Sequence, residues 1–321
     1  IPSPDTEPPA AAAVERRRTN ADRRSEPMHR PAYSLLVLLL VASGGATVSS
    51  TPLAASPAAA ADTSAAVDTV EPAAGAPFPA PVASPLEPRT RLAPVHVDRP
   101  GRNRWVGLVN LGETLPFRLL RRADTVPAAG PPPTALWGEV AGGAFSRFDL
   151  EGRGNEFVEV HYRAALRLRA RWRGLKARMA FYHVSSHLGD EFLERTGRDP
   201  ISTSREGLEL LAAVRPVPAL RLYGGPGLVL RSTAGLEPGT ARVGAEWRPA
   251  DGRWGPFRPY AAGELLLREE LGWEPTVSTE AGLAFADRYR LALMLGAGPS
   301  RAEQFFRQDE TLWGLSFSAD F

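Results

Sequence analysis

The segment at residues 182–191 carries most of the side chains in this sequence that could do chemistry. His183 and Ser185 stand two positions apart, and Glu206 follows after an intervening stretch. A serine hydroxyl becomes a nucleophile when an imidazole accepts its proton, and a carboxylate can hold that imidazole in the required tautomer. Ser185, His183 and Glu206 are therefore the candidate catalytic residues, as nucleophile, base and orienting acid.

Two other interpretations of this segment remain open. In the structural one, His183 bonds Glu206 and Asp190 caps backbone donors, so that these groups tie a loop to its strands. In the metal one, Asp190 and Glu191 bind a hard cation such as calcium. His183 and His187 are too far apart on a straight strand to share one ion. No other cofactor is expected.

Alternating residues on both sides of the segment predict that strands position it. Residues 158–168 place apolar side chains at every second position, which is typical of a strand with one apolar face. Residues 177–181 repeat this pattern after a tight turn, which predicts a hairpin. If Met179 faces Leu210 on the returning strand, His183 faces Glu206 and Ser185 faces Ser204, within contact distance.

Similar segments continue to the end of the chain and predict an all-β protein. They span residues 104–111, 115–121, 208–214, 220–230, 243–247, 261–267, 277–285, 289–295 and 311–321. An aliphatic outer face and a charged inner face favour an antiparallel transmembrane β-barrel of about twelve strands, with ten as the alternative. The predicted inward residues are Arg167, Arg178, Arg221, Glu209, Glu264 and Glu280. Because such charges can pair across a narrow lumen, a general open pore is not expected.

Connection lengths orient the predicted barrel. Short connections at 172–175, 215–218 and 287–288 belong on the periplasmic side, and longer ones at 188–200 and 300–309 belong outside. This orientation places His183 and Ser185 on the lipid-facing side at the outer leaflet. Polar groups that face lipid are energetically costly, and a function that acts on the lipid itself would account for them. Outer-membrane lipids are therefore the expected partners and substrates.

The sequence before residue 101 is predicted to lie outside the barrel. Residues 1–27 precede Met28 and are interpreted as an over-extended N-terminus, and residues 28–61 have the charged, apolar and small-residue order of a signal peptide. Residues 62–100 are rich in Ala and Pro and predict a disordered linker, which leaves 101–321 for the barrel.

Composition narrows the function further. The absence of Cys excludes disulfides and thiolate chemistry. A net charge of +2 with no basic face argues against nucleic-acid binding. The alternating C-terminus, which ends on Phe321, resembles the aromatic signal of bacterial barrel proteins. It predicts recognition by the barrel-assembly machinery and a location in the outer membrane of a Gram-negative-type bacterium.

Most of residues 100–321 resembles the bacterial family labelled domain of unknown function 1207. The resemblance lies in Phe-Tyr-His-Val-Ser-Ser-His-Leu-Gly-Asp-Glu-Phe at 181–192, Ser-Arg-Glu at 204–206 and Arg-Leu-Tyr-Gly-Gly at 221–225. It implies an exported, barrel-like envelope protein and carries no activity. The His183-x-Ser185 pair is also similar to the arrangement in outer-membrane phospholipase A and lipid A deacylase barrels, and Glu206 is similar to the deacylases' acidic partner. No Asn at a comparable spacing matches the phospholipase pattern.

Three functions follow from these observations. The first is an outer-membrane barrel with a structural, adhesive or small-solute role. The second is a serine-type esterase that acts on outer-leaflet phospholipid or lipid A acyl chains. The third is a soluble periplasmic β-protein, because a soluble sandwich also shows alternation.

Overall fold

We describe the protein from a computed structural model, for residues 78–121, 135–152, 154–172, 174–201, 203–249, 252–286 and 288–320. The predicted over-extension, the predicted signal peptide, residues 62–77 of the predicted linker and Phe321 lie outside the described residues. None of the described helices has the length and hydropathy needed to cross a membrane.

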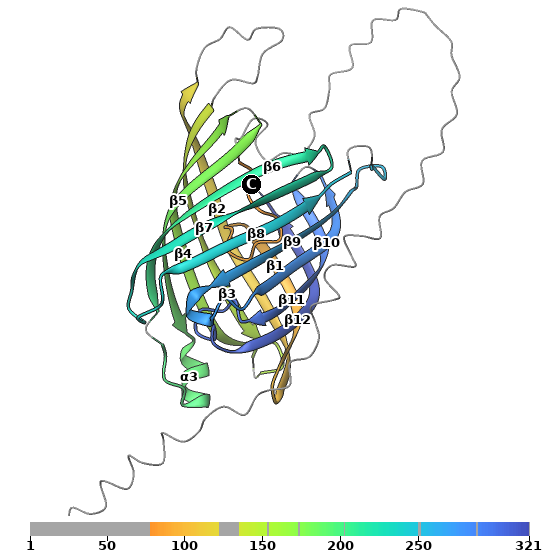
Figure 1. Ribbon diagram of the computed structural model, residues 1–321. Helices are drawn as coiled ribbons and strands as arrows, with labels where there is room; N and C mark the ends of the chain where they lie inside the picture. The colour runs from red at the N-terminus through yellow and green to blue at the C-terminus, as the bar shows by residue number, and fades with distance from the viewer. Residues whose placement is uncertain are drawn as a thin grey trace, which may run out of the picture. The chain divides into compact units, whose positions relative to one another are not determined.

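The described residues form a closed antiparallel barrel, in which sequence neighbours pair and β1 pairs with β12 (Figure 1). A short helix, α3 (Asp190–Thr196), follows β5, and a 3-10 turn, η2 (Glu269–Leu271), follows β9. The predicted barrel of about twelve antiparallel strands is confirmed. The strands are β1 (Thr90–Arg99), β2 (Arg102–Arg121), β3 (Ala135–Asp149), β4 (Glu156–Trp172), β5 (Leu175–Leu188), β6 (Ser204–Val217), β7 (Leu220–Ser232), β8 (Gly239–Trp247), β9 (Arg258–Arg268), β10 (Thr276–Phe285), β11 (Tyr289–Pro299) and β12 (Asp309–Ala319).

The first three strands differ from the prediction. The two strands predicted at 104–111 and 115–121 are one long strand, β2, and both β1 and β3 were not predicted. Because β1 begins at Thr90, the barrel starts within the range that was assigned to a disordered linker. The predicted boundary at residue 101 is therefore wrong.

Packing inside the barrel explains why β1 was missed. Its inward residues Ala93, Val95 and Val97 are buried against Leu312 of the neighbouring strand β12 and Met294 of the next strand, β11. The alternation of β1 is weak in the sequence because Arg91 shares the inner face with these apolar residues and Pro94 lies on the outer face.

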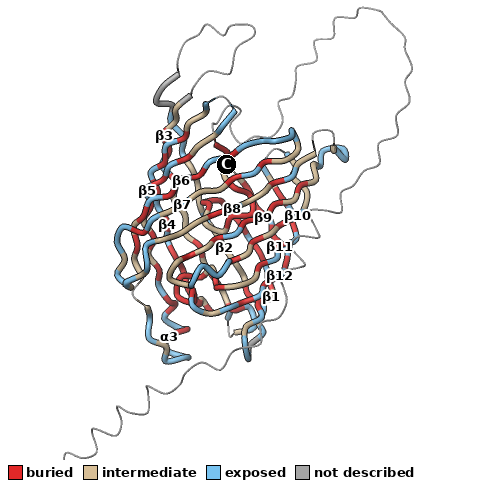
Figure 2. The backbone as a smooth tube through the Cα atoms, viewed as in Figure 1, coloured by how far each residue is buried: buried red, intermediate tan, exposed pale blue. Residues whose placement is uncertain are grey.

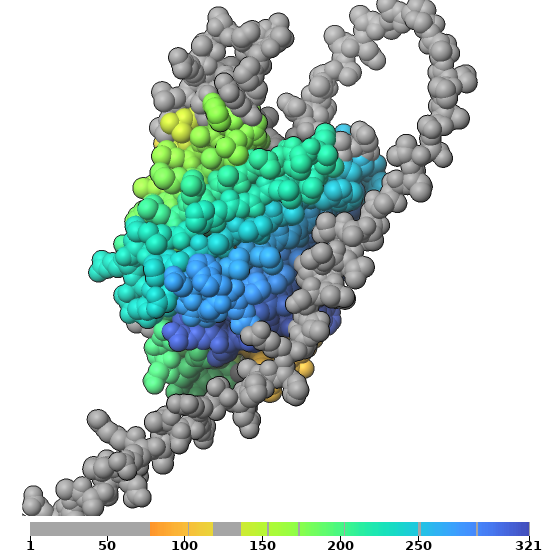
Figure 3. All heavy atoms as spheres, in the orientation of Figure 1, coloured from red at the N-terminus to blue at the C-terminus, as the bar shows by residue number. Residues whose placement is uncertain are grey.

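Buried and more exposed positions alternate along the strands (Figure 2). The buried set contains many charged residues, and the exposed set contains many aliphatic ones. All six charged residues predicted to face inward are buried. The outer surface over β6 to β10 forms a continuous wall in the space-filling view (Figure 3). Its exposed apolar residues include Leu208, Leu210, Leu222, Leu228, Leu230, Val243 and Leu265.

Two stretches of chain fold into the lumen. We call residues 78–89, which precede β1, the inner segment, and residues 300–308, between β11 and β12, the inner loop. Phe78 and Val82 of the inner segment and Gln304 and Phe306 of the inner loop are all at most 2% exposed. In this up-and-down topology β1 begins and β12 ends at one end of the barrel, whereas α3 and the inner loop lie at the other.

Candidate functional site

The catalytic candidates lie on the outer face of two adjacent strands. His183 and Ser185 belong to β5, and Glu206 belongs to β6. The register pairs His183 with Glu206 and Ser185 with Ser204, which is the predicted register. The alternate residues of the same strands point inward, and the buried ones nearest the candidates include Tyr182, Val184, Ser186 and Arg205.

His183 and Glu206 contact each other at the surface of the wall. The Nδ1 atom of His183 lies 3.5 Å from Oε1 of Glu206, and the two side chains are 45% and 37% exposed. If Nδ1 carries the proton and donates to this carboxylate, Nε2 is left as the proton acceptor. The pair can therefore supply a general base that faces outward.

Ser185 lies on the same face as His183 and Glu206, but it is not hydrogen-bonded to His183. It lies two residues from His183 on the same face, half-buried, opposite Tyr162 of β4. Among the described residues, no hydrogen bond joins the Ser185 hydroxyl to His183. Catalytic hydrogen bonds are often long before substrate binds, and rotation about the serine Cα–Cβ bond is sufficient to turn the hydroxyl.

A cation on the next strand extends this outer-face row. Arg231 of β7 is exposed and is paired in register with Glu206, so that His183, Glu206 and Arg231 follow one another across β5, β6 and β7. A register shift between Glu206 and Gly207 brings Arg231 opposite Glu206. Strict alternation from the outward residues Leu228 and Leu230 would place Arg231 on the inner face. For this reason the sequence pattern did not identify Arg231 as an outward residue.

The predicted metal ligands do not form a metal-binding cluster. Asp190 and Glu191 occupy the first turn of α3, and both are exposed. Within the described ranges, no three His, Cys, Asp or Glu side chains come together in a way that could hold a metal ion. The expected capping by Asp190 is also not formed, because Gly189 is the N-cap residue and no side chain caps the helix.

The lumen holds a second concentration of polar groups. Glu310 accepts two hydrogen bonds from Arg147, each 3.0 Å long, and two from Arg99, at 2.7 and 3.1 Å. Arg91 pairs with Glu280 at 2.7 Å. These ion pairs cross-link strands from inside, and the predicted pairing of charges across the lumen is confirmed.

The inner loop closes the end of the lumen beside α3. The amide of Gln304 donates to Ser186 Oγ at 2.8 Å and to the Ile201 carbonyl at 2.8 Å. Phe305 packs with Phe192 of α3, with their rings 5.9 Å apart. Together these contacts fix the connection between β5 and β6 to the interior, behind the outer face that carries His183.

A closed antiparallel barrel with an aliphatic exterior and paired charges inside belongs to the transmembrane β-barrel class. The sequence profile of the family described as "Protein of unknown function (DUF1207)" matches residues 95–321. The chain belongs to this family.

Several solved structures of barrels are similar to this chain. Outer membrane phospholipase A from Escherichia coli is 15% identical with a TM-score of 0.46, over 74% of this chain and 100% of that chain. The KdgM porin in complex with oligogalacturonate is 9% identical with a TM-score of 0.42, over 72% and 99%. LpxR from Salmonella typhimurium is 11% identical with a TM-score of 0.32, over 72% and 100%. No curated protein matches the sequence.

Proposed function

We propose that this chain is an outer-membrane barrel that acts at its lipid-facing wall, as a serine-type hydrolase of acyl esters in outer-leaflet lipids. The observation that carries the proposal is the contact of His183 with Glu206 on the outer face, with Ser185 on the same face. An acid, a base and a nucleophile on the lipid side of a barrel are costly, and hydrolysis of a membrane lipid accounts for their position.

In the proposed reaction, His183 takes the proton from the Ser185 hydroxyl as its oxygen attacks the acyl carbonyl. The ester bond then breaks, the leaving alcohol takes the proton from His183, and the acyl group stays on Ser185. Water, activated by His183, releases the fatty acid. Glu206 stabilises the imidazolium, and Arg231 is suited to an anionic headgroup beside the ester.

A structural or adhesive role is the second candidate. It is favoured by the Ser185 hydroxyl, which among the described residues has no hydrogen bond to His183. In that case His183 and Glu206 serve only to join β5 to β6. The filled lumen supports both candidates over a small-solute channel, since the inner segment and inner loop occupy it.

Aromatic side chains at both barrel ends support the membrane location. Trp105 and Trp313 meet edge to face at 5.5 Å near the end that carries α3, and both are exposed. Tyr289 and Phe317 stack at 5.9 Å near the other end. Outward aromatics that flank an aliphatic band are typical of barrels in lipid. In this proposal Phe321 is read by the barrel-assembly machinery.

Leu293→Arg tests the membrane location against a soluble periplasmic protein. Leu293 lies in the middle of β11 and is 62% exposed. An arginine facing lipid there is expected to cost about 2–4 kcal/mol of unfolding free energy in bilayers. The measurement is urea unfolding in lipid vesicles, with Glu194→Arg on exposed α3 as the control. Equal stability of both variants, with extraction in the absence of detergent, would show a soluble protein.

Acyl release and covalent labelling test the hydrolase. The purified full chain is given phospholipid or lipopolysaccharide, with and without calcium, and released fatty acid is measured. A fluorophosphonate probe is expected to label Ser185, because only an activated serine attacks it. Labelling is located by peptide mass. Absence of both acyl release and labelling under all four conditions would leave the structural role.

A further inference from the structure

The inner segment is held in the lumen by the barrel wall. The backbone amide of Val82 donates to Glu246 at 2.7 Å, and Arg221 donates to the Pro79 carbonyl at 2.6 Å. Phe78 at the beginning of the segment is fully buried, and the guanidinium groups of Arg178 and Arg221 lie over its ring at 5.2 and 5.0 Å.

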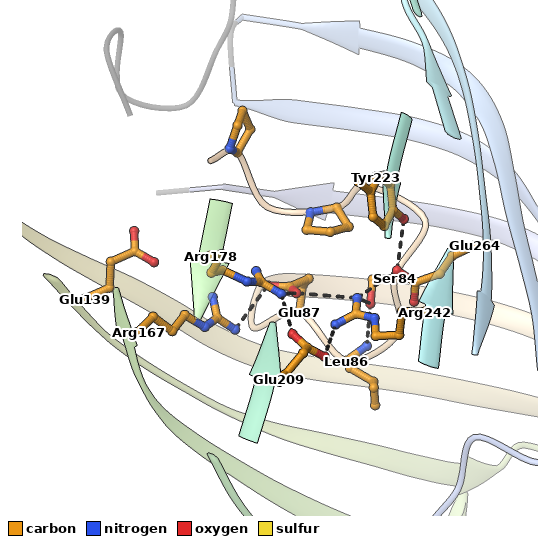
Figure 4. Close-up of polar contacts among 12 residues, drawn as sticks. Ser84, Leu86, Glu87, Glu139, Arg167, Arg178, Glu209, Tyr223, Arg242 and Glu264 are labelled. Carbon is orange, nitrogen blue, oxygen red and sulfur yellow. Dashed lines mark hydrogen bonds and ion pairs between the residues drawn. The ribbon is translucent and has the colours of Figure 1, made fainter. Parts of the chain in front are cut away.

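The carboxylate of Glu87 is surrounded by three arginine residues from three strands (Figure 4). Arg178 makes two hydrogen bonds to it, at 2.9 and 2.6 Å. Arg167 lies 3.1 Å and Arg242 3.6 Å from its oxygens. We call Arg167, Arg178 and Arg242 the arginine trio. Glu87 and all three partners are at most 3% exposed, so this is a site built inside the barrel.

The trio has more hydrogen-bond donors than Glu87 uses. Among the described residues, Glu87 is the one carboxylate that forms an ion pair with Arg167, whose buried Nε and Nη1 atoms have no hydrogen-bond partner. Arg178 and Arg242 also pair with Glu209, at 2.9 and 2.6 Å. Burial alone would raise the pKa of Glu87, but attraction to Arg167, Arg178 and Arg242 outweighs it and holds this pKa well below its ordinary value.

We infer that the arginine trio is a carboxylate-binding site in the lumen, that Glu87 is its resident occupant, and that an acidic solute can take the same place when Glu87 is withdrawn. Three facts support this. The occupant comes from a segment outside the barrel wall, whereas the trio belongs to the wall. Arg167 without Glu87 would be a buried cation with no partner, which is costly. Planar guanidinium groups match carboxylates with paired hydrogen bonds. The site is separate from the proposed hydrolase site and does not depend on it.

Chemical rescue of Glu87→Ala tests this site. The substitution removes a group of the size and charge of acetate, so added acetate can refill the space. We expect the thermal unfolding midpoint of the full-length variant to fall below that of the wild type. Acetate at roughly ten times its Kd should then raise it by about 3–6 °C over sodium chloride of equal ionic strength. Acetamide, which has the same shape and no charge, should not.

Two controls make the result specific. Wild type and Glu87→Gln should not respond to acetate, because a side chain already occupies the space in each. If Glu87→Ala fails to fold in chloride, its refolding yield in acetate is compared with that in acetamide. Recovery in acetate alone supports the site. Equal responses in wild type and variant, an equal effect of acetamide, or no effect of acetate in either measurement would overturn it.

Discussion

Ser185→Ala is expected to lower the rate of lipid acyl release by at least about 10³-fold, because loss of the nucleophile removes the covalent route. The barrel should fold normally, since the Ser185 hydroxyl forms no hydrogen bond with His183 among the described residues. The measurement is the initial rate of fatty-acid release in mixed micelles. Heat-modifiable gel mobility confirms that the variant is folded.

The adjacent serine provides a matched control. Ser186 points into the lumen, is 7% exposed and accepts a hydrogen bond from Gln304. Ser186→Ala is therefore expected to lower the free energy of unfolding by about 1 kcal/mol, because it removes this hydrogen bond. The variant should retain acyl release. Hydrolysis by Ser185→Ala at the wild-type rate, or an equal loss in both variants, would show that Ser185 is not the nucleophile. Glu206→Gln should lower the rate less than Ser185→Ala, because an orienting acid contributes less than the nucleophile.

Arg178→Met is expected to destabilise the barrel by about 3–5 kcal/mol, because it leaves Glu87 and Glu209 buried with one cation fewer. Arg178 is 1% exposed and bonds both carboxylates. The measurement is the free energy of unfolding in detergent, from guanidinium titration of the variant and the wild type. Destabilisation should be accompanied by greater protease access to residues 78–89.

Arg104→Met is the control for this substitution. Arg104 pairs with Glu151 at 3.3 Å and lies 4.0 Å from the buried carboxylate of Asp149. Its own side chain is 38% exposed and that of Glu151 is 40% exposed, so water screens the charge of Arg104. An exposed pair contributes about 0–1 kcal/mol, so the same chemical change should have little effect there. Equal destabilisation by the two variants would mean that the lumen charges are not desolvated as the structure indicates.

Strands in which apolar and polar residues alternate could be predicted from the sequence. The nine strands from β4 to β12 are of this kind and were predicted. The pairing of His183 with Glu206 followed as well, because face and register together determine which side chains meet. β3 was missed because its stretch Val140-Ala-Gly-Gly-Ala144 has small residues on both faces. Such residues leave the period-two signal too weak to recognise.

The occupants of the lumen could not be predicted from local pattern. Glu87 reaches Arg178 across 91 positions of sequence, and Gln304 reaches Ser186 across 118. The inner segment resembles a Pro- and Ala-rich linker in sequence because four of its twelve residues are Pro and two are Ala. Its order comes from the charges of the surrounding wall, and a local sequence window does not contain these.

The inner segment leads directly into β1, and β1 forms the seam of the barrel by pairing with β12. Glu87, the acid that pairs with all three arginines of the trio, therefore lies just before the strand that completes the cylinder. Without Glu87 in the lumen, Arg178 and Arg242 still pair with carboxylates of the wall, whereas Arg167 has no carboxylate partner among the described residues. When β1 joins β12, Glu87 is within reach of its site a few residues away. Pairing of β1 with β12 therefore places Glu87 beside Arg167, which has no other carboxylate partner among the described residues.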